Sequence, residues 1–258
     1  MSRLWPELLD AGLFPGRCWL ARGSGRHELL VQIDAPMQAS GLLSGLDQCL
    51  ALAESHRKGR SRVAVTVSDG IAAITPLPWQ SGLTGGVERQ GYARLCFEKL
   101  GCDIDEAWAL HVEYPRYGAS GMAYALPRDW MDALLAGLAE RRLLLGNVLP
   151  LSARAFCGAT DSAKPGLTIV LLFEPMHHCA LVFQDRMFVA REVEPVAQSE
   201  VKTCRRLLAR ILAGRAPGAA GDVNLLWWAY KEMEFPQEAI REYAAGARIA
   251  PIAAGAWT

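Results

Sequence analysis

The sequence of 258 residues lacks any apolar run close to the ~20 residues that a membrane-spanning helix requires, so we predict no membrane span. Residues 1–7 also lack the apolar core of a secretory signal, and we therefore expect a cytoplasmic protein. Neither sign of charge is in excess, because Lys and Arg total 27 and Asp and Glu total 27. This balance excludes a global basic field for nucleic acid, and the 51% of hydrophobic residues excludes a disordered chain.

Motifs of catalysis and of metal binding are also missing. The seven cysteines form no CxxC pair, which argues against a disulfide framework and a zinc ribbon, and most of them lie inside apolar runs. The sequence has neither a GxxxxGK[ST] phosphate loop nor a GxSxG nucleophile elbow. We therefore predict no catalytic residue and no bound metal.

The sequence does contain a regular alternation of strand and helix patterns. The segment up to Gly16 has a short apolar patch and is expected to be an N-terminal arm or a brief helix. After it, β-branched or alternating runs predict strands, and apolar side chains at helical spacing predict helices. The expected strands are 18–21, 28–33, 63–67, 71–77, 107–114, 121–126 and 143–149, and the expected helices are 42–53, 87–100 and one that begins after Pro127.

Residues 157–166 are small or turn-forming and show no periodicity, which predicts a linker. Beyond it we expect strands at 167–173, 178–183, 187–193 and 223–230, and helices at 200–213 and 236–247. A meander of strands, a helix and a further strand is also the order of the first part, if one of its strands is weak. We therefore predict an α/β protein built by approximate duplication, with a first half at 1–156, the linker, and a shorter second half at 167–258.

Six short motifs occur between residues 17 and 230: Val63–Asp69, Pro76–Trp79, Glu88–Arg94, Trp108–Leu110, Tyr124–Pro127 and Leu145–Pro150. In their order they resemble the actin-like, ribonuclease H-like superfamily. Within it they are most similar to the cytoplasmic proteins of bacterial type IV pilus and type II secretion platforms (PilM- and GspL-like proteins). The resemblance implies two ribonuclease H-like subdomains with mixed sheets flanked by helices, the second one shortened.

The resemblance also implies a function. Proteins of that family bind the short cytoplasmic tail of an inner-membrane partner and contact the assembly ATPase. It therefore implies a non-catalytic cytoplasmic scaffold that lies at the inner membrane through its partners, with no cofactor and no nucleic acid; homodimerisation stays open. The alternative is an actin-like ATPase or kinase that binds ATP and magnesium between the two subdomains, and a third possibility is an α/β protein outside this superfamily.

The expected nucleotide-binding turns favour the scaffold. Actin-like ATPases carry an acid and glycines in the first hairpin of each half, where amides hold phosphates and the carboxylate organises a metal ion. We take Arg22–Arg26 as the first turn, where arginines stand in place of the acid and would repel magnesium. In the second turn Glu174 keeps the acid, but Pro175 removes an amide donor. The residues that would bind nucleotide and metal under the ATPase alternative are Gly23, Ser24, Gly25 and Glu174.

One pair of histidines and one pair of glutamates could suggest a metal site, but both have simpler interpretations. His177 and His178 are neighbours in an expected strand, so their side chains point to opposite faces and cannot both bind one ion. Glu192 and Glu194 share a strand face and are expected to be a solvated edge.

The expected helix 200–213 carries the clearest partner signal. Its apolar residues gather on one side, which is typical of an ordinary surface helix. The functional alternative is a docking face for an acidic protein segment on the opposite side, formed by Lys202, Arg205, Arg206 and Arg210. For Trp227 and Trp228, on opposite faces of a strand, we expect core packing, and an uncovered edge of the second sheet would suit strand addition by a partner peptide.

Overall fold

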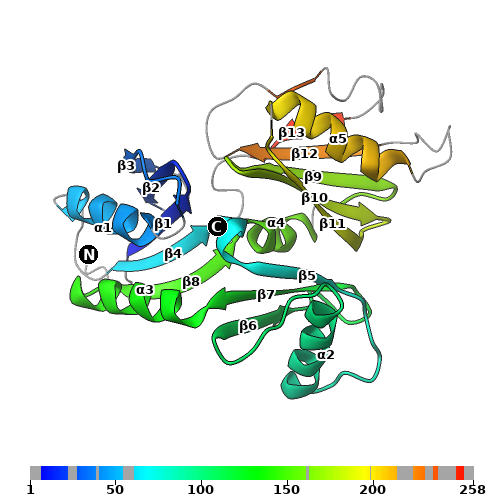
Figure 1. Cartoon of the computed structure of the whole chain (residues 1–258), viewed down its shortest axis with the longest axis horizontal. Helices are drawn as coiled ribbons and strands as arrows, with labels where there is room; N and C mark the ends of the chain where they lie inside the picture. The colour runs from blue at the N-terminus through cyan, green and yellow to red at the C-terminus, as the bar shows by residue number, and fades with distance from the viewer. Residues whose placement is uncertain are drawn as a thin grey trace, which may run out of the picture.

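The computed structural model of the chain describes residues 7–22, 28–38, 41–54, 61–160, 163–197, 199–213, 223–229, 235–237 and 248–252. These residues fold into two five-stranded sheets, one three-stranded sheet and the helices that pack on them (Figure 1). None of the helices in this part of the chain is long and apolar enough to cross a membrane.

The first half is built on a sheet with the strand order β3-β2-β1-β4-β8. β1, β2 and β3 are antiparallel neighbours, whereas β4 and β8 run parallel to β1. Helix α1 packs on β1, β2 and β3, and α3 contacts α1 and β8. The elements are β1 (Glu7–Phe14), β2 (Arg17–Arg22), β3 (Glu28–Ile33), α1 (Leu42–Leu52), β4 (Ser61–Val67), α3 (Arg128–Glu140) and β8 (Leu144–Pro150).

The prediction of an N-terminal arm or brief helix is wrong for residues 7–14. They form β1, which lies between β2 and β4 in the sheet, and its last six residues are buried. Asp10 and Gly12 interrupt the apolar pattern and are poor strand formers, so the sequence signal is weak at this point. With β1 in place, the first half has the full meander of three strands.

The second half repeats this topology with the strand order β11-β10-β9-β12-β13. A helix again joins the third strand of the meander to a strand parallel to the first, which confirms the predicted duplicated α/β fold. β13 was not predicted, and residues 238–247 of the expected last helix lie outside the described residues. The elements are β9 (Leu167–Phe173), β10 (His177–Gln184), β11 (Met187–Pro195), α5 (Glu200–Ala213), β12 (Val223–Ala229) and β13 (Arg248–Pro251).

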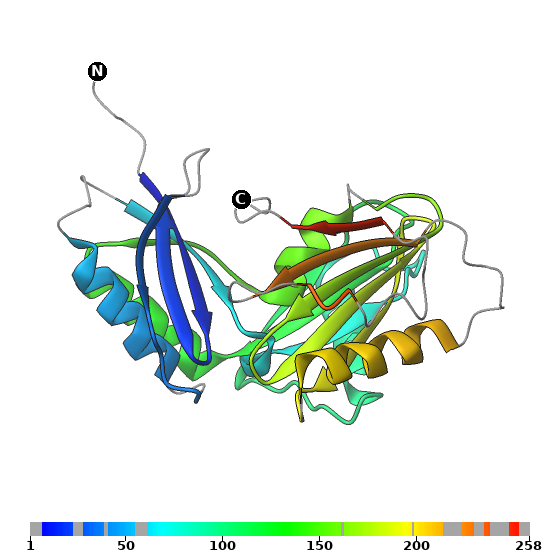
Figure 2. The same cartoon turned by 90° about the horizontal axis from the view of Figure 1, so that it is seen from above.

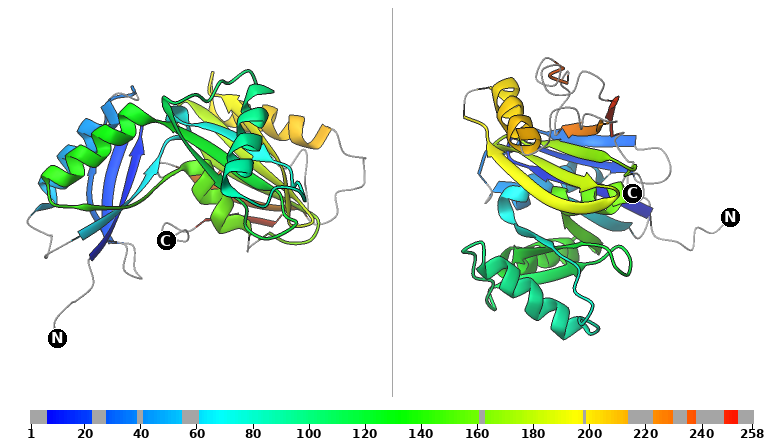
Figure 3. Two further views of the ribbon diagram at one scale, coloured as in Figure 1. Left: turned by 90° about the horizontal axis from the view of Figure 1, so that it is seen from below. Right: turned by 90° about the vertical axis from the view of Figure 1, so that its right-hand side faces the viewer.

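An insertion between β4 and α3 makes the first half longer. It forms an antiparallel sheet of order β5-β7-β6 with helix α2 and a small core of its own, and it projects to one side of the molecule (Figure 3, right). Its elements are β5 (Ala73–Leu77), α2 (Gly86–Glu98), β6 (Trp108–Glu113) and β7 (Gly121–Pro127), all close to the predicted ranges.

Helix α4 (Leu151–Thr160) joins the two halves and contacts β4 and β8 of the first sheet as well as β9 and β10 of the second. Figure 2 shows the two five-stranded sheets lying side by side, the first with its three antiparallel strands in blue and the second in yellow-green, orange and red. The predicted linker is therefore wrong at its start, because residues 157–160 are the last turn of α4. Ala155 and Ala159 are buried and let the helix pack closely between the sheets, whereas in the sequence Ala159 belonged to the run of small residues that indicated a linker.

Candidate functional site

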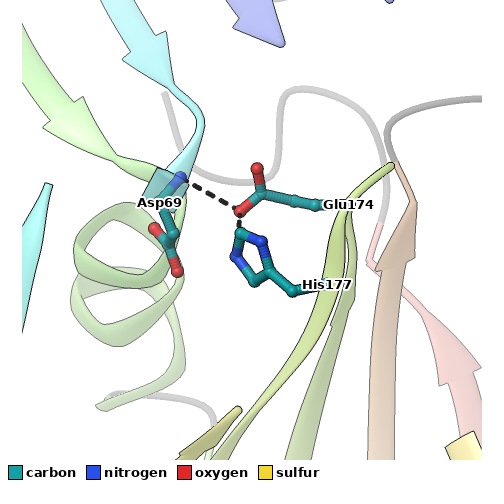
Figure 4. Close-up of side chains that lie close together, drawn as sticks. All are labelled: Asp69, Glu174 and His177. Atoms are coloured by element: carbon teal, nitrogen blue, oxygen red, sulfur yellow. Dashed lines mark hydrogen bonds and ion pairs between the residues drawn. The ribbon is translucent and has the colours of Figure 1, made fainter. Parts of the chain in front are cut away.

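A buried cluster of polar side chains lies where the two halves meet. Asp69 begins a short 3-10 helix (Asp69–Ile71) directly after β4, and Glu174 and His177 bound the turn between β9 and β10. Figure 4 shows Glu174 between the backbone of Asp69 and the ring of His177. The side chains of Asp69 and Glu174 are fully buried.

Hydrogen bonds of Ser68 fix the backbone conformation next to Asp69. Its N–H donates to the carbonyl of Leu13 at the end of β1 (2.9 Å), and its hydroxyl accepts from the N–H of Gly70 (3.1 Å). The Asp69 carboxylate then faces the first turn of α4, where the Ser152 N–H donates to Oδ1 (2.8 Å) and the Ser152 hydroxyl donates to Oδ2. Because the first N–H groups of a helix have no partner within it, Asp69 caps α4 from a distant part of the chain.

Glu174 reaches across from the second half to the same segment. Its Oε1 accepts from the backbone N–H of Asp69 (3.1 Å), and its Oε2 accepts from the hydroxyl of Ser68. His177 Nε2 lies 3.3 Å from Glu174 Oε1, and the Glu174 N–H donates to the His177 carbonyl (3.1 Å), which closes the turn.

Arg191 on β11 is the cation of the cluster. Its Nη2 lies 3.0 Å from Asp69 Oδ2, and its Nε donates to the Ser152 hydroxyl (3.2 Å). All four carboxylate oxygens of Asp69 and Glu174 therefore accept hydrogen bonds from donors of the protein itself.

Burial and charge shift the titration of the groups around Arg191. Burial, followed by repulsion from Asp69, raises the pKa of Glu174 despite its hydrogen bonds to His177 and Ser68. For His177, burial lowers the pKa, but the hydrogen bond and the attraction to Glu174 outweigh it, so that the pKa is raised overall. Burial raises the pKa of the Cys179 thiol to about 11, so this thiol is protonated at neutral pH.

The cluster does not fit the magnesium ion of an actin-like ATPase. Asp69, Glu174 and His177 each offer a ligand atom, and these atoms lie within 4.8 Å of one another. The carboxylate oxygens, however, already accept hydrogen bonds, and the guanidinium of Arg191 is ion-paired with Asp69. A divalent cation would have to displace these donors and approach a buried positive charge.

The turns that would bind phosphates also differ from the expectation. Because residues 7–14 form a strand, the first hairpin turn of the first half is Pro15-Gly16, and the prediction that placed it at Arg22–Arg26 is wrong. A proline therefore follows the first strand in both halves, at Pro15 and Pro175, and removes an amide from each turn. The Gly16 N–H donates to the carbonyl of Pro36 (3.3 Å). Gly23, Ser24 and Gly25 belong to the connection between β2 and β3 and lie outside the described residues.

The cationic face of α5 is partly neutralised within the protein. Arg206 pairs with Glu194 (2.8 Å), and Arg210 pairs with both Glu192 (2.9 Å) and Glu194 (2.8 Å) on the neighbouring strand β11. These acids were expected to be a solvated edge, but the helix packs beside them. Lys202 and Arg205 are exposed on the outer face of α5.

The histidines separate as predicted for a strand. His178 packs against Phe173, with ring centroids 4.6 Å apart, while His177 contacts Glu174. Burial lowers the pKa of His178 to about 4, so this histidine is neutral at physiological pH. The two tryptophans also pack on opposite faces of β12, Trp227 against Phe173 and Trp228 against Phe14.

Of this cluster, the sequence identified Glu174 and missed Asp69, Ser152 and Arg191. For Asp69 a signal exists, because a Ser-Asp pair follows a buried parallel strand, and polar groups gather at the carboxyl ends of such strands. Arg191 carries no comparable signal, since it lies within a strand and its partner is 122 residues away.

Comparisons with known proteins identify the fold. No family model matches the sequence, and no curated protein matches it. By structure the chain is similar to a Bacteroides thetaiotaomicron VPI-5482 protein with an actin-like ATPase fold and unknown function. The TM-score is 0.67 at 9% identity, over 95% of this chain and 90% of that one.

Two further similar structures come from secretion and pilus machines. The cytoplasmic domain of EpsL, an inner-membrane component of the type II secretion system of Vibrio cholerae, has a TM-score of 0.57 at 13% identity, over 96% of this chain and 91% of that one. PilM in the PilM–PilN type IV pilus biogenesis complex has a TM-score of 0.62 at 12% identity, over 95% of this chain and 88% of that one. At these identities the likeness shows the fold, and the predicted actin-like fold is confirmed.

Proposed function

We propose that the chain is a non-catalytic scaffold of a bacterial pilus-assembly or protein-secretion platform, where it binds a segment of a partner protein. The observation that carries this proposal is the saturation of Asp69 and Glu174 by donors of the protein itself. Phosphoryl transfer needs carboxylate oxygens that are open to a metal ion and amides that face phosphates. Capture of a peptide requires neither.

The similar structures support the choice of machine. EpsL is an inner-membrane component of a type II secretion system, and PilM forms a complex with PilN in type IV pilus biogenesis. By analogy with these proteins, the partner of this chain is the short cytoplasmic tail of an inner-membrane protein, with an assembly ATPase as a second contact. The chain then lies in the cytoplasm, at the inner membrane through its partners.

The outer face of α5 is the proposed contact for an acidic partner segment. All four cationic residues predicted for this face are exposed, and Arg206 and Arg210 pair with Glu192 and Glu194 of β11. Exposed charges of this kind steer association more than they add affinity. Because Arg206 and Arg210 already pair with acids of the protein, we expect Arg205 to contribute most to binding, supported by the exposed charge of Lys202.

An actin-like ATPase is the second candidate, because the ligand atoms of Asp69, Glu174 and His177 lie within 4.8 Å of one another. Calorimetric titration with ATP and magnesium separates the candidates. If the chain is a non-catalytic scaffold, titration with ATP and magnesium should give no binding heat, and no phosphate should be released. Micromolar binding that Glu174→Ala abolishes would overturn the scaffold and support the ATPase.

A peptide titration tests the partner directly. The labelled cytoplasmic tail of a single-span platform protein from the same organism is titrated with the full chain, and saturable binding is expected. Replacing both Lys202 and Arg205 by glutamate should weaken binding by about tenfold, with a strong dependence on salt. Arg116→Glu, at an exposed position of the insertion, is the matched control and should leave binding unchanged.

A further inference from the structure

The ion pair between Asp69 and Arg191 joins the two halves of the molecule. Asp69 follows β4 of the first half, and Arg191 lies on β11 of the second, 122 residues further along the chain. The Asp69 side chain is fully buried and that of Arg191 is 14% exposed. Breaking such a pair from one side leaves a buried charge without compensation, which makes the contact hard to open.

The guanidinium has the charge and the geometry to take the part of a bound cation. It contacts the Asp69 carboxylate and the Ser152 hydroxyl with separate nitrogen atoms, and it stays protonated at every physiological pH. We propose that Arg191 replaces the metal ion of actin-like ATPases as the cation that joins the halves, so that they keep one arrangement without nucleotide or metal. We call this contact of Arg191 with Asp69 and Ser152 the latch. It occupies the place where a magnesium ion would otherwise have to bind.

A second contact across the halves needs no ligand either. Phe14, the last residue of β1, is completely buried, and its ring packs against Trp228 of β12 with a centroid distance of 5.3 Å. Phe14 directly precedes the first hairpin turn, where an actin-like ATPase would place a phosphate. An apolar contact at this point stabilises the observed arrangement of the two halves through burial alone.

The latch does not depend on which partner the chain binds, so it can be tested on the full chain alone. Hydrogen–deuterium exchange is measured at the amides of Asp69 and Ser152, which donate to the two carboxylates. Arg191→Met should speed exchange at both amides by about tenfold or more, because the carboxylates lose their cation. Exchange in α2 should not change, and Arg205→Met on exposed α5 is the matched control.

The double variant Asp69→Asn/Arg191→Met keeps the test independent of folding defects. Removing both charges should restore most of the lost protection, as for other buried ion pairs, and Arg191→Lys, which keeps the charge, should lie between wild type and Arg191→Met. Unchanged exchange in Arg191→Met would overturn the latch. Additive effects of Asp69→Asn and Arg191→Met in the double variant would also overturn it.

Metal binding provides a readout of a different kind. The wild-type chain should show no melting shift and no change in its scattering curve with Mn²⁺ or with magnesium and ATP. Arg191→Met removes the buried positive charge that opposes a metal ion beside Asp69, Glu174 and His177. A Mn²⁺-dependent rise in melting temperature that Glu174→Gln abolishes should therefore be found only in this variant, if the remaining donors can be displaced. A wild-type Mn²⁺ site that is lost in Asp69→Asn would refute the replacement of metal by Arg191.

Discussion

Gly12 of β1 lies directly beneath the indole of Trp19, its cross-strand partner on β2. A Cβ atom added at Gly12 would stand 2.1 Å from Nε1 and from Cε2 of that indole. The glycine that weakens the strand signal in the sequence is therefore the residue that lets Trp19 lie across the central strand.

We expect Gly12→Ala to lower the free energy of unfolding by about 1–3 kcal/mol, because the indole must move out of its rotamer or push β1 away from β2. Urea unfolding followed by circular dichroism measures the change. Gly91→Ala on the exposed face of α2 is the control: nothing lies within 4 Å of the added Cβ, and the variant should be more stable by about 0.5–1 kcal/mol. Equal effects of the two substitutions would contradict the close contact.

The stability of the protein should fall as pH rises above neutrality. The pKa of His177 is raised in the folded state, so its protonated form stabilises the fold fully below pH ~6.5, and this contribution is lost as pH rises through the folded-state pKa. The raised pKa of Glu174 has the same sign, but its contribution begins to be lost at lower pH, as pH rises from ~4.5 through the folded-state pKa of this carboxyl. The groups that face His177 are Glu174, Asp69 and Arg191.

Urea unfolding between about pH 6 and pH 8.5 tests this expectation, and His177→Gln should flatten the profile. A wild-type profile that is already flat in this range would show that His177 titrates as it does in the unfolded chain.

His178 has the opposite effect, in a lower pH range. Its pKa of about 4 means that the folded state resists protonation, so stability is lost as pH falls from ~6.5 towards 4, by up to about 3 kcal/mol. Neither ring nitrogen has a hydrogen-bond partner among the described residues. His178→Phe, which keeps the ring beside Phe173, should remove this loss and exceed the wild type in stability at about pH 4.5. An unchanged acid slope in the variant would assign the loss to other groups.

The elements could be predicted where the pattern of apolar residues decides the structure alone. The bounds of β9 and α5 match the expectation because all seven residues of β9 are buried and α5 has a clean apolar face. β1 was not predicted because Gly12 and Asp10 interrupt its apolar pattern. In the fold, both residues are accommodated by groups outside β1: the indole of Trp19 lies against Gly12, and the charge of Arg154 on α4 is close to Asp10. Tertiary contacts of this kind leave no trace in local periodicity.

The candidate site was predictable only in the part that follows from chain order. Glu174 follows a strand whose position in the repeat is clear, so its place in a hairpin turn could be inferred. The partnership of Asp69 with Arg191 requires the register of β11 against the end of β4, which no local signal contains. The error at the first hairpin has the same origin, because missing β1 moved the repeat by one strand.

The ion pairs between α5 and β11 should contribute little to stability. Arg210 is 44% exposed on its side chain, and Glu192 36%, so water screens their interaction. Arg210→Ala should lower the free energy of unfolding by less than about 1 kcal/mol, and high salt should reduce the difference further. Arg205→Ala serves as the control on the same helix. A loss of several kcal/mol would mean that Arg210 supports the packing of α5 through its alkyl chain.

The contact between Phe14 and Trp228 should be a measurable coupling between the halves. Phe14 is fully buried at the end of β1, and its ring lies 5.3 Å from that of Trp228. Phe14→Leu and Trp228→Leu should each destabilise the fold, and their double-mutant cycle should yield a coupling of about 0.5–1.5 kcal/mol, since the aromatic pair exists only while the halves are closed. A coupling near zero would mean that the two rings are buried independently, each against its own half, and the closed arrangement would then rest on the polar cluster alone.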